Sequence, residues 1–344
     1  MNKTKNPDRL KYWDIAKGIT ILLVVLGHAE NVNPFIRVAI FSYHMPFFFI
    51  ANAYFIKNYN MLECIKKSSK SLLVPYAVTC ILSAMLCVSQ NNGGLPGYQV
   101  FILRIADMFA GMSKISVKFT QFQSVWLVWF VICLFAARII YIFLMKFLKD
   151  KNIFISLVVM LILSYAGMVT GKYYAYLPWS IDVALVAMSF MWFGNMLNKF
   201  GLIPKFNKTL YIICFAIWII LGILGFEIEM SMRDYPGYIL CIIEAISGSI
   251  LCIGVSVLIE SKLPVISMFF AWCGKNSMVI LIIHCLEMRF LDWNAVIFIN
   301  IPMKLNWIVI FVVKLVLILL ATWIIVQIKN IIKSYPVSGK KIVD

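Results

Sequence analysis

The sequence predicts an all-α integral membrane protein that forms a single domain over residues 1–344. Hydrophobic residues make up 62% of the chain and charged residues only 13%, which is more apolar surface than a soluble domain would bury. The apolar residues are gathered in long runs, and basic residues lie between these runs. Aromatic residues, at 15%, are frequent enough to form belts at both membrane interfaces.

Ten apolar runs, of about 18–25 residues each, are long enough to cross roughly 30 Å of hydrocarbon as helices. In chain order we expect them at residues 13–30, 34–56, 70–88, 124–146, 153–170, 177–198, 209–227, 237–259, 275–298 and 305–328. The ninth run is the least distinct, because EMRFLDW places charges at its far end. Between the third and fourth runs, VFILRIADMFAGM has the pattern of an amphipathic helix at the interface.

The distribution of basic residues orients these helices. With a cytoplasmic N-terminus, the inner segments hold 20 Lys and Arg and the outer segments 8, while Lys17, Arg138 and Lys314 fall inside spans. This asymmetry follows the positive-inside rule and predicts that both termini are cytoplasmic. Topology therefore explains the net charge of +16, and we expect no nucleic-acid partner. Arg138 and Lys314 are interpreted as side chains that snorkel to an interface.

All three histidines, His28, His44 and His284, fall within expected spans, as do Asp182 and Glu244. An unpaired ionisable group in the bilayer costs at least about 2.5 kcal/mol, so such residues usually face a polar cavity and have a function. We therefore expect the histidines to share one cavity. Glu244 has an alternative interpretation as half of a structural hydrogen-bonded pair. The nine cysteines contain no CxxC pair, and we expect no metal site.

Lys17 and His28 lie eleven residues apart in the first span. At about 100° per residue, eleven residues turn a helix about 20° past three full circles, so both side chains share one face, about 16 Å apart. Asp14, three residues before Lys17, is close enough to hold its ammonium in place. This face fits a long ligand with phosphates at the cytoplasmic end and a reactive group deeper, as in coenzyme A. A snorkelling lysine beside an unrelated histidine fits the spacing about equally well.

Several segments resemble the acyltransferase type 3 family of bacterial membrane O-acyltransferases. RLKYWDIAKGITILLVVLGH resembles the family's first helix, in which a basic residue, ten others and a histidine follow one another, as from Lys17 to His28. FSYHMPFFFIANAYFI resembles its second helix, and WFVICLF a later one. LPWSIDVALVAMSFMWFGNML and GKNSMVILIIH resemble the fucose 4-O-acetylase-like branch. Asn52 and Ala53 stand where the family usually has Ser-Gly, which leaves the substrate class open.

The resemblance covers the whole chain and implies ten helices with both ends inside. It also implies that an acyl group, most often acetyl, passes from cytoplasmic acyl-CoA to a hydroxyl of a cell-surface or lipid-linked sugar. The protein would lie in the bacterial plasma membrane. Its partners would be acetyl-CoA or another acyl-CoA as donor substrate, the glycan acceptor and the lipid bilayer, with no permanently bound cofactor.

A sugar hydroxyl is a weak nucleophile that needs a general base, and a neutral imidazole suits this role near pH 7. We assign this role to His28, with a short-lived acyl-histidine as the other route. Lys17 and Asp14 are assigned to coenzyme A binding. The residues assigned to substrate binding are His44, Asp182, His284, Glu30 and Glu244. Of these, Glu30 is equally compatible with a solvated loop position.

Two other functions are compatible with these residues. Buried His, Asp and Glu also occur in proton-coupled transporters of small polar substrates, such as the amino-acid uptake module of a membrane racemase. No internal repeat is visible, which weakly disfavours transporter folds built on repeats. A membrane scaffold would not require a cation and an imidazole on one helix face. Binding or hydrolysis of acyl-CoA distinguishes an acyltransferase from both.

Overall fold

A computed structural model describes residues 10–56, 60–90, 94–114, 121–203, 206–293 and 303–334. The described residues form helices without a β-strand, which confirms the all-α class for this part of the chain. The helices in the first half are α1 (Lys11–Gly27), α2 (Pro34–Phe41), α3 (His44–Tyr54), α4 (Met61–Ser68), α5 (Val74–Ser89), α6 (Gly97–Ala110), α7 (Trp129–Leu148) and α8 (Ile153–Val169). Those in the second half are α9 (Ile181–Val186), α10 (Met188–Lys199), α11 (Lys208–Ile223), α12 (Ile239–Lys262), α13 (Pro264–Lys275), α14 (Ser277–Phe290) and α16 (Met303–Ser334).

By length and composition, six segments of the described chain are able to cross a membrane. They are Pro34–Tyr54, Met61–Ser89, Trp126–Leu148, Ile153–Tyr174, Ile239–Lys262 and Trp307–Ile332. Two bent pairs, α9 with α10 at 56° and α13 with α14 at 68°, raise the number to eight. α1 and α11 are shorter, with 17 and 16 residues. Each of the ten expected spans overlaps a helix, but a count of ten crossings stays a prediction.

The largest difference from the expected arrangement precedes the ninth expected span. Residues 264–275, which we expected to form a cytoplasmic connection, fold into α13. Pro264 begins this helix, where its fixed φ suits the first turn and its missing N–H is not needed. The span expected at 275–298 then begins as α14, which ends at Phe290. Residues 294–298 of that span lie outside the described residues.

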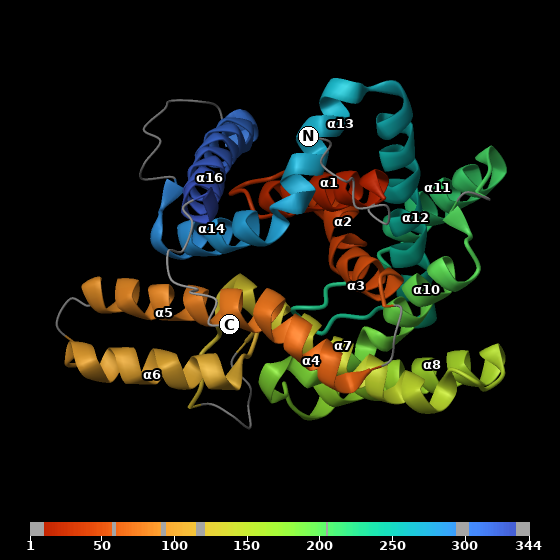
Figure 1. The fold of residues 1–344 in the computed structure, drawn as a ribbon, viewed down its shortest axis with the longest axis horizontal. Coiled ribbons are helices and arrows are strands. Elements are labelled where there is room, and N and C mark those ends of the chain that lie inside the picture. The colour runs from red at the N-terminus through yellow and green to blue at the C-terminus, as the bar shows by residue number, and fades with distance from the viewer. Residues whose placement is uncertain are drawn as a thin grey trace, which may run out of the picture.

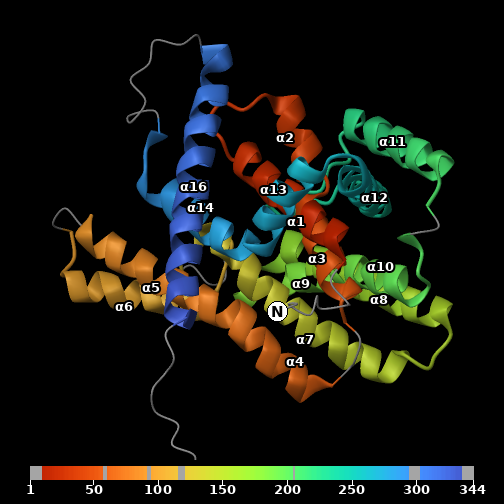
Figure 2. The ribbon, with the colours of Figure 1, turned by 45° about the horizontal axis from the view of Figure 1, so that its top comes forward.

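α1 lies inside the helix bundle, where α2, α3, α12, α13, α14 and α16 all pack against it (Figure 2). Most of its residues are consequently buried. α5 and α6 form an antiparallel pair at one edge of the molecule (Figure 1). The helix expected from VFILRIADMFAGM is thus present as α6. These outer helices expose large apolar side chains, as lipid-facing surfaces do, whereas α1 is placed to carry polar groups away from lipid.

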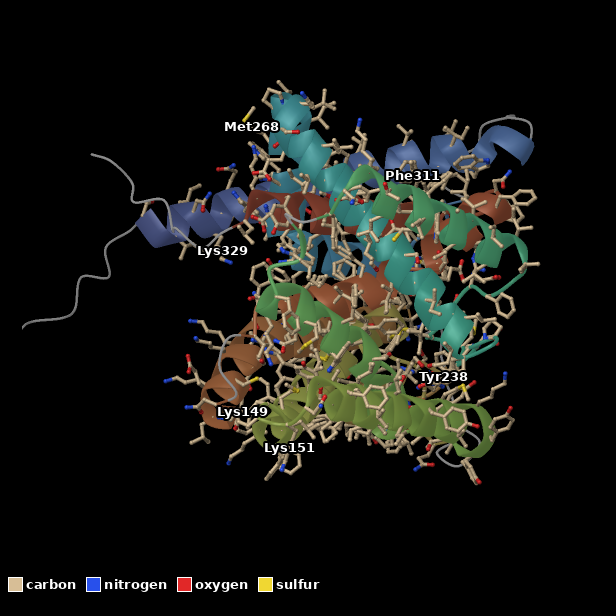
Figure 3. The ribbon with its side chains drawn as sticks, turned by 90° about the vertical axis from the view of Figure 1, so that its right-hand side faces the viewer. Lys149, Lys151, Tyr238, Met268, Phe311 and Lys329 are labelled. Atoms are coloured by element: carbon tan, nitrogen blue, oxygen red, sulfur yellow. The ribbon has the colours of Figure 1, made fainter. Side chains whose placement is uncertain are left out.

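Residues from segments expected on opposite sides of the membrane can be located at the ends of the bundle. Figure 3 shows Lys149, Lys151 and Lys329 toward one end, and Tyr238 toward the opposite end. The three lysines belong to segments that we expect to be cytoplasmic, whereas Tyr238 adjoins a loop that we expect outside. The relative placement of these residues therefore agrees with the expected alternation. The orientation of the bundle in the membrane stays a prediction.

Candidate functional site

A cavity of about 370 Å³ lies beside α1. Its walls come mainly from α1, α3, α7, α13 and α14, together with the loop between α11 and α12. Lys17 and His28 both line this cavity, and so do Asp14 and His44. The structure thus brings together four of the residues that the sequence analysis selected. Three of them lie on or directly after α1, on the face that their spacing predicts.

The cavity wall contains two further cations that the sequence analysis did not assign to a site. Arg138 of α7 and Lys275 at the end of α13 line the cavity together with Lys17. Nε of Arg138 is buried without a hydrogen-bond partner among the described residues, so an anion in the cavity would be a suitable partner. Arg138 therefore lines the cavity, and its expected snorkelling to an interface stays a prediction. The ammonium of Lys17 lies 4.8 Å from the centre of the Phe55 ring.

Backbone contact between α1 and α13 fixes the spacing of these charges. A Cβ atom at Gly18 would overlap the carbonyl oxygen of Phe270, and one at Gly274 would overlap that of Asp14. Glycine at both positions lets the two helix backbones touch. Lys275 is consequently held beside the first turns of α1. The sequence contained this signal only as two glycines, without an indication that they face each other.

The departure from the family's second-helix pattern also lies in this cavity. Asn52 lines the wall, and its Oδ1 is buried without a hydrogen-bond partner among the described residues. Ala53 is fully buried, as expected for a small residue at a helix contact. Asn52 therefore offers an amide to a bound molecule where the family usually offers a hydroxyl.

Backbone carbonyl groups fix the tautomers of the two cavity histidines. Nδ1 of His28 lies 2.9 Å from the carbonyl oxygen of Val24, and Nδ1 of His44 lies 3.0 Å from that of Ile40. A carbonyl oxygen only accepts hydrogen bonds, so Nδ1 carries the proton in each neutral ring. Nε2 of each ring is left as a base with a free lone pair, which is the form that proton abstraction requires.

His284 does not line the cavity but packs directly against His28. The two ring centres are 5.6 Å apart in an edge-to-face arrangement, and His284 is fully buried. Nδ1 of His284 lies 2.7 Å from Oε1 of Glu287, which also accepts a hydrogen bond from Trp293 through its other oxygen. Nε2 of His284 has no hydrogen-bond partner within the described ranges. The three histidines therefore form one group, although only two of them reach the cavity.

Lys314 lies in this group and does not snorkel, which corrects the expectation from the sequence. Its side chain is 0% exposed, with Nζ 3.4 Å from Oε1 of Glu287 and 3.7 Å from Oε2 of Glu30. The reason is that α16 packs against α14, which carries Glu287, and against α1, whose following turn carries Glu30. Glu30 is thus neither a free loop residue nor part of the cavity lining. Its assigned contact with substrate stays a prediction.

Asp182 and Glu244 are buried outside the cavity. Asp182 lies 2.7 Å from Nε of Arg233, a loop residue that also donates a hydrogen bond to the hydroxyl of Ser113. This ion pair uses both carboxylate oxygens of Asp182 and ties the loop between α11 and α12 to α9. Glu244 of α12 lies beside Gly222 of α11, and its oxygens have no hydrogen-bond partner within the described ranges. The substrate contacts assigned to both residues stay predictions.

The loop between α11 and α12 supplies two cavity residues that the sequence analysis missed. Glu229 and Ser231 line the cavity, and Glu229 lies 3.6 Å from the guanidinium of Arg37. Burial raises the pKa of this carboxyl. The sequence marked this stretch as an acidic outer loop, but it gave no sign that the loop folds inward over the bundle.

Comparisons with known proteins identify the family. No curated protein and no solved structure matches the chain. A model of the family described as an acyltransferase domain matches residues 10–327, which is nearly the whole chain and includes every helix of the cavity wall. The apolar helices and this match make the protein a multi-pass membrane acyltransferase. The chain belongs to the acyltransferase type 3 family.

Proposed function

We propose that this protein moves an acyl group, in the simplest case acetyl, from cytoplasmic acyl-CoA to a hydroxyl of a cell-surface or lipid-linked sugar. The observation that carries the proposal is a single cavity whose wall includes Lys17, Arg138 and Lys275 as well as the imidazole of His28. The three cations suit the phosphates of coenzyme A. Lys17 and His28 lie about 16 Å apart along one helix face, so a bound donor would extend from the cations toward the imidazole.

In this proposal His28 acts as the general base through Nε2. The hydroxyl oxygen of the sugar attacks the thioester carbonyl carbon while its proton passes to Nε2. The C–S bond then breaks, and the thiolate of coenzyme A takes the proton from the imidazolium as it leaves. In the alternative route Nε2 itself attacks the carbonyl carbon, the C–S bond breaks, and coenzyme A leaves as the thiolate. The sugar hydroxyl oxygen then attacks the acyl carbon of the acyl-imidazole, the C–N bond breaks, and the hydroxyl proton passes to the thiolate.

His44 fits the acceptor better than the donor. Its Nδ1 donates to the carbonyl of Ile40, so a neutral His44 presents only a lone pair at Nε2. Such a nitrogen accepts a hydrogen bond from a sugar hydroxyl but does not donate one to a thioester carbonyl. Orientation of the acceptor is therefore the role that we propose for His44. Asn52 and Ser231, in the same wall, are further candidates to bind hydroxyl groups.

We place the protein in the bacterial plasma membrane with both termini cytoplasmic, as the basic loops predict. This orientation presents the first turns of α1 to the cytoplasmic pool of acyl-CoA. The family assignment supports the transferase over the transporter, for which the described part of the chain offers no specific observation.

The proposal is tested with purified protein in lipid nanodiscs. Wild-type protein should bind acetyl-CoA, and His28→Ala should retain that binding because His28 is not part of the phosphate site. In cells, wild-type protein should add acetyl groups to surface glycans, measured by mass spectrometry. His28→Ala should reduce this transfer by about 10²–10⁴ because a general base is lost. His28→Gln, which keeps a polar group without the base, should be equally inactive.

The same measurements decide against the proposal in two cases. A wild-type protein that folds but does not bind acetyl-CoA would favour a transporter or a scaffold. A folded His28→Ala protein with near-normal transfer would remove His28 from the mechanism. The glycan that loses its acyl group in cells without the protein identifies the acceptor.

A further inference from the structure

Glu30, Glu287 and Lys314 form a group of charges where α14 and α16 meet the end of α1; we call it the Lys314 cluster. Lys314 and Glu287 are buried, and Oε2 of Glu30 is buried although the Glu30 side chain is 30% exposed. One ammonium lies within 4 Å of two carboxylates, at 3.4 Å from Glu287 and 3.7 Å from Glu30. With all three groups ionised, two negative charges and one positive charge leave a formal charge of −1. The cluster is therefore unbalanced by one charge in a region with little solvent.

The cluster is connected to the cavity through two imidazoles. Oε1 of Glu287, the atom nearest to Lys314, also lies 2.7 Å from Nδ1 of His284. The ring of His284 packs edge-to-face against that of His28, which lines the cavity. Nε2 of His284 has no hydrogen-bond partner in the described part of the chain. A proton taken up by this pair of imidazoles would therefore lie beside a net negative charge.

We infer that the Lys314 cluster balances the charge of the proton that the His28–His284 pair carries during acyl transfer. The inference rests on the proposed function, in which His28 takes a proton from the acceptor hydroxyl and returns it to the departing thiolate. Between these two events the imidazole pair carries one positive charge, and the cluster carries one negative charge. Glu30, Glu287 and Lys314 are positioning residues in this account, because none of them lines the cavity.

Lys314 sets the amount of negative charge. Without its ammonium, two carboxylates would hold a proton on the imidazole pair at neutral pH, and no free base would remain for the hydroxyl. Without one of the carboxylates, the cluster would be neutral, and the protonated pair would be an unbalanced buried charge. A net charge of −1 allows the pair to be neutral before the reaction and protonated during it.

Within the described residues, further charged and titratable groups near the pair lie on α2, on α3 and in the loop between α11 and α12. His44 of α3 lies in the same cavity wall as His28. Arg37 of α2 lies near both, and its guanidinium pairs with Glu229 of the loop at 3.6 Å. Because Arg37 and Glu229 offset each other, the Lys314 cluster determines the sign of the net charge beside the imidazole pair.

The test measures the protonation of His28 directly and requires no acceptor. Diethyl pyrocarbonate modifies only the unprotonated nitrogen of imidazole, and peptide mass spectrometry reports the labelling rate of His28 as a function of pH. We expect the pH of half-maximal labelling to rise by about 1–3 units in Lys314→Met and to fall in Glu287→Gln. A purely structural role would not move these two midpoints in opposite directions.

Two controls separate charge from packing. Lys314→Arg keeps the charge, and its midpoint should stay near that of the wild type. The double variant Lys314→Met with Glu30→Gln restores a net charge of −1, so its midpoint should return toward the wild-type value. If Lys314→Met does not insert into the membrane, Glu30→Gln is used as the second variant. The inference requires that Glu30→Gln lower the labelling midpoint, as Glu287→Gln does.

Midpoints that do not move, or that move in the same direction in Lys314→Met and Glu287→Gln, would overturn the inference. So would a midpoint that does not fall in Glu30→Gln. None of these results bears on whether the protein is an acyltransferase, because the labelling requires no turnover. The proposed function fails on its own measurement, which is near-normal acyl transfer by His28→Ala.

Discussion

Two groups of buried charge in this membrane protein differ in how completely they are paired. The side chains of Arg233 and Asp182 are 1% and 0% exposed, and two guanidinium nitrogens lie 2.7 and 3.2 Å from the two carboxylate oxygens. Their charges cancel and their geometry is bidentate. In the Lys314 cluster one ammonium is shared by two carboxylates at longer distances, and one negative charge remains.

The difference shows which buried charges are available for chemistry. The pair of Arg233 and Asp182 has no free charge or oxygen for a ligand, and it lies outside the cavity. The Lys314 cluster adjoins the two histidines next to the cavity, and its excess charge favours the uptake of a proton. Burial of a charge within a membrane protein therefore does not by itself mark a substrate site. Charge balance and contact with a cavity distinguish the two cases.

The largest expected effect comes from breaking the balanced pair. Arg233→Met leaves the carboxylate of Asp182 buried without a counter-charge, which should lower the free energy of unfolding by about 3–5 kcal/mol. The double variant Arg233→Met with Asp182→Leu removes both charges and should recover most of this loss. Unfolding in mixed micelles measures both variants. A single variant as stable as the wild type would show that the pair is not structural.

Removal of a cation that faces the cavity should weaken ligand binding and have little effect on stability. Lys17→Ala should weaken acetyl-CoA binding about ten- to a hundredfold, since a charge-assisted hydrogen bond contributes about 1.5–3 kcal/mol. Its stability should change little. Lys17→Arg keeps the charge with a different donor geometry and should retain part of the affinity. The dissociation constant is measured in nanodiscs at two salt concentrations, because the contribution of Lys17 should decrease as salt increases.

Lys149→Ala is the matched control for Lys17→Ala. Lys149 is an exposed lysine at the end of α7, outside the cavity lining, and its replacement changes the net charge by the same amount. It should leave the dissociation constant unchanged. If Lys17→Ala also leaves this constant unchanged but lowers stability, Lys17 anchors the helix and does not bind phosphate.

The parts of the site that could be predicted from the sequence depend on short-range geometry. Helix periodicity places Lys17 and His28 on one face, and His44 follows on the next transmembrane segment. The helices can also be predicted from the sequence, because a long apolar run that crosses lipid has few backbone conformations available to it other than a helix. These predictions require no knowledge of how one helix is rotated against another.

The remaining parts of the site depend on tertiary packing, which the sequence pattern does not contain. Lys275 reaches the cavity only because Gly18 and Gly274 bring α13 against α1. Lys314 was interpreted as snorkelling because its carboxylate partners lie on other segments, far away in the sequence. For Asp182 the sequence suggested a ligand where the structure shows a protein partner. That partner, Arg233, lies in a loop 51 residues away and neutralises the carboxylate.

The smallest expected effect concerns Glu229, a carboxylate in the same loop as Arg233 whose partner Arg37 is half exposed. Burial raises the pKa of Glu229, so the folded protein holds this proton more tightly than the unfolded chain does. The stability that the proton contributes is present below the unfolded pKa of about 4.3. It is lost as the pH rises through the raised folded pKa.

Glu229→Gln should therefore be more stable than the wild type at pH 7, by at most about 1 kcal/mol, and equally stable near pH 4. Arg37→Gln, which removes the counter-charge, should be less stable at pH 7. Unfolding free energies at the two pH values measure both variants. If Glu229→Gln raises the free energy of unfolding and Arg233→Met lowers it, the charge of Glu229 opposes folding and that of Arg233, in the same loop, is required for it. A Glu229→Gln protein less stable than wild type at pH 7 would show instead that pairing with Arg37 outweighs burial.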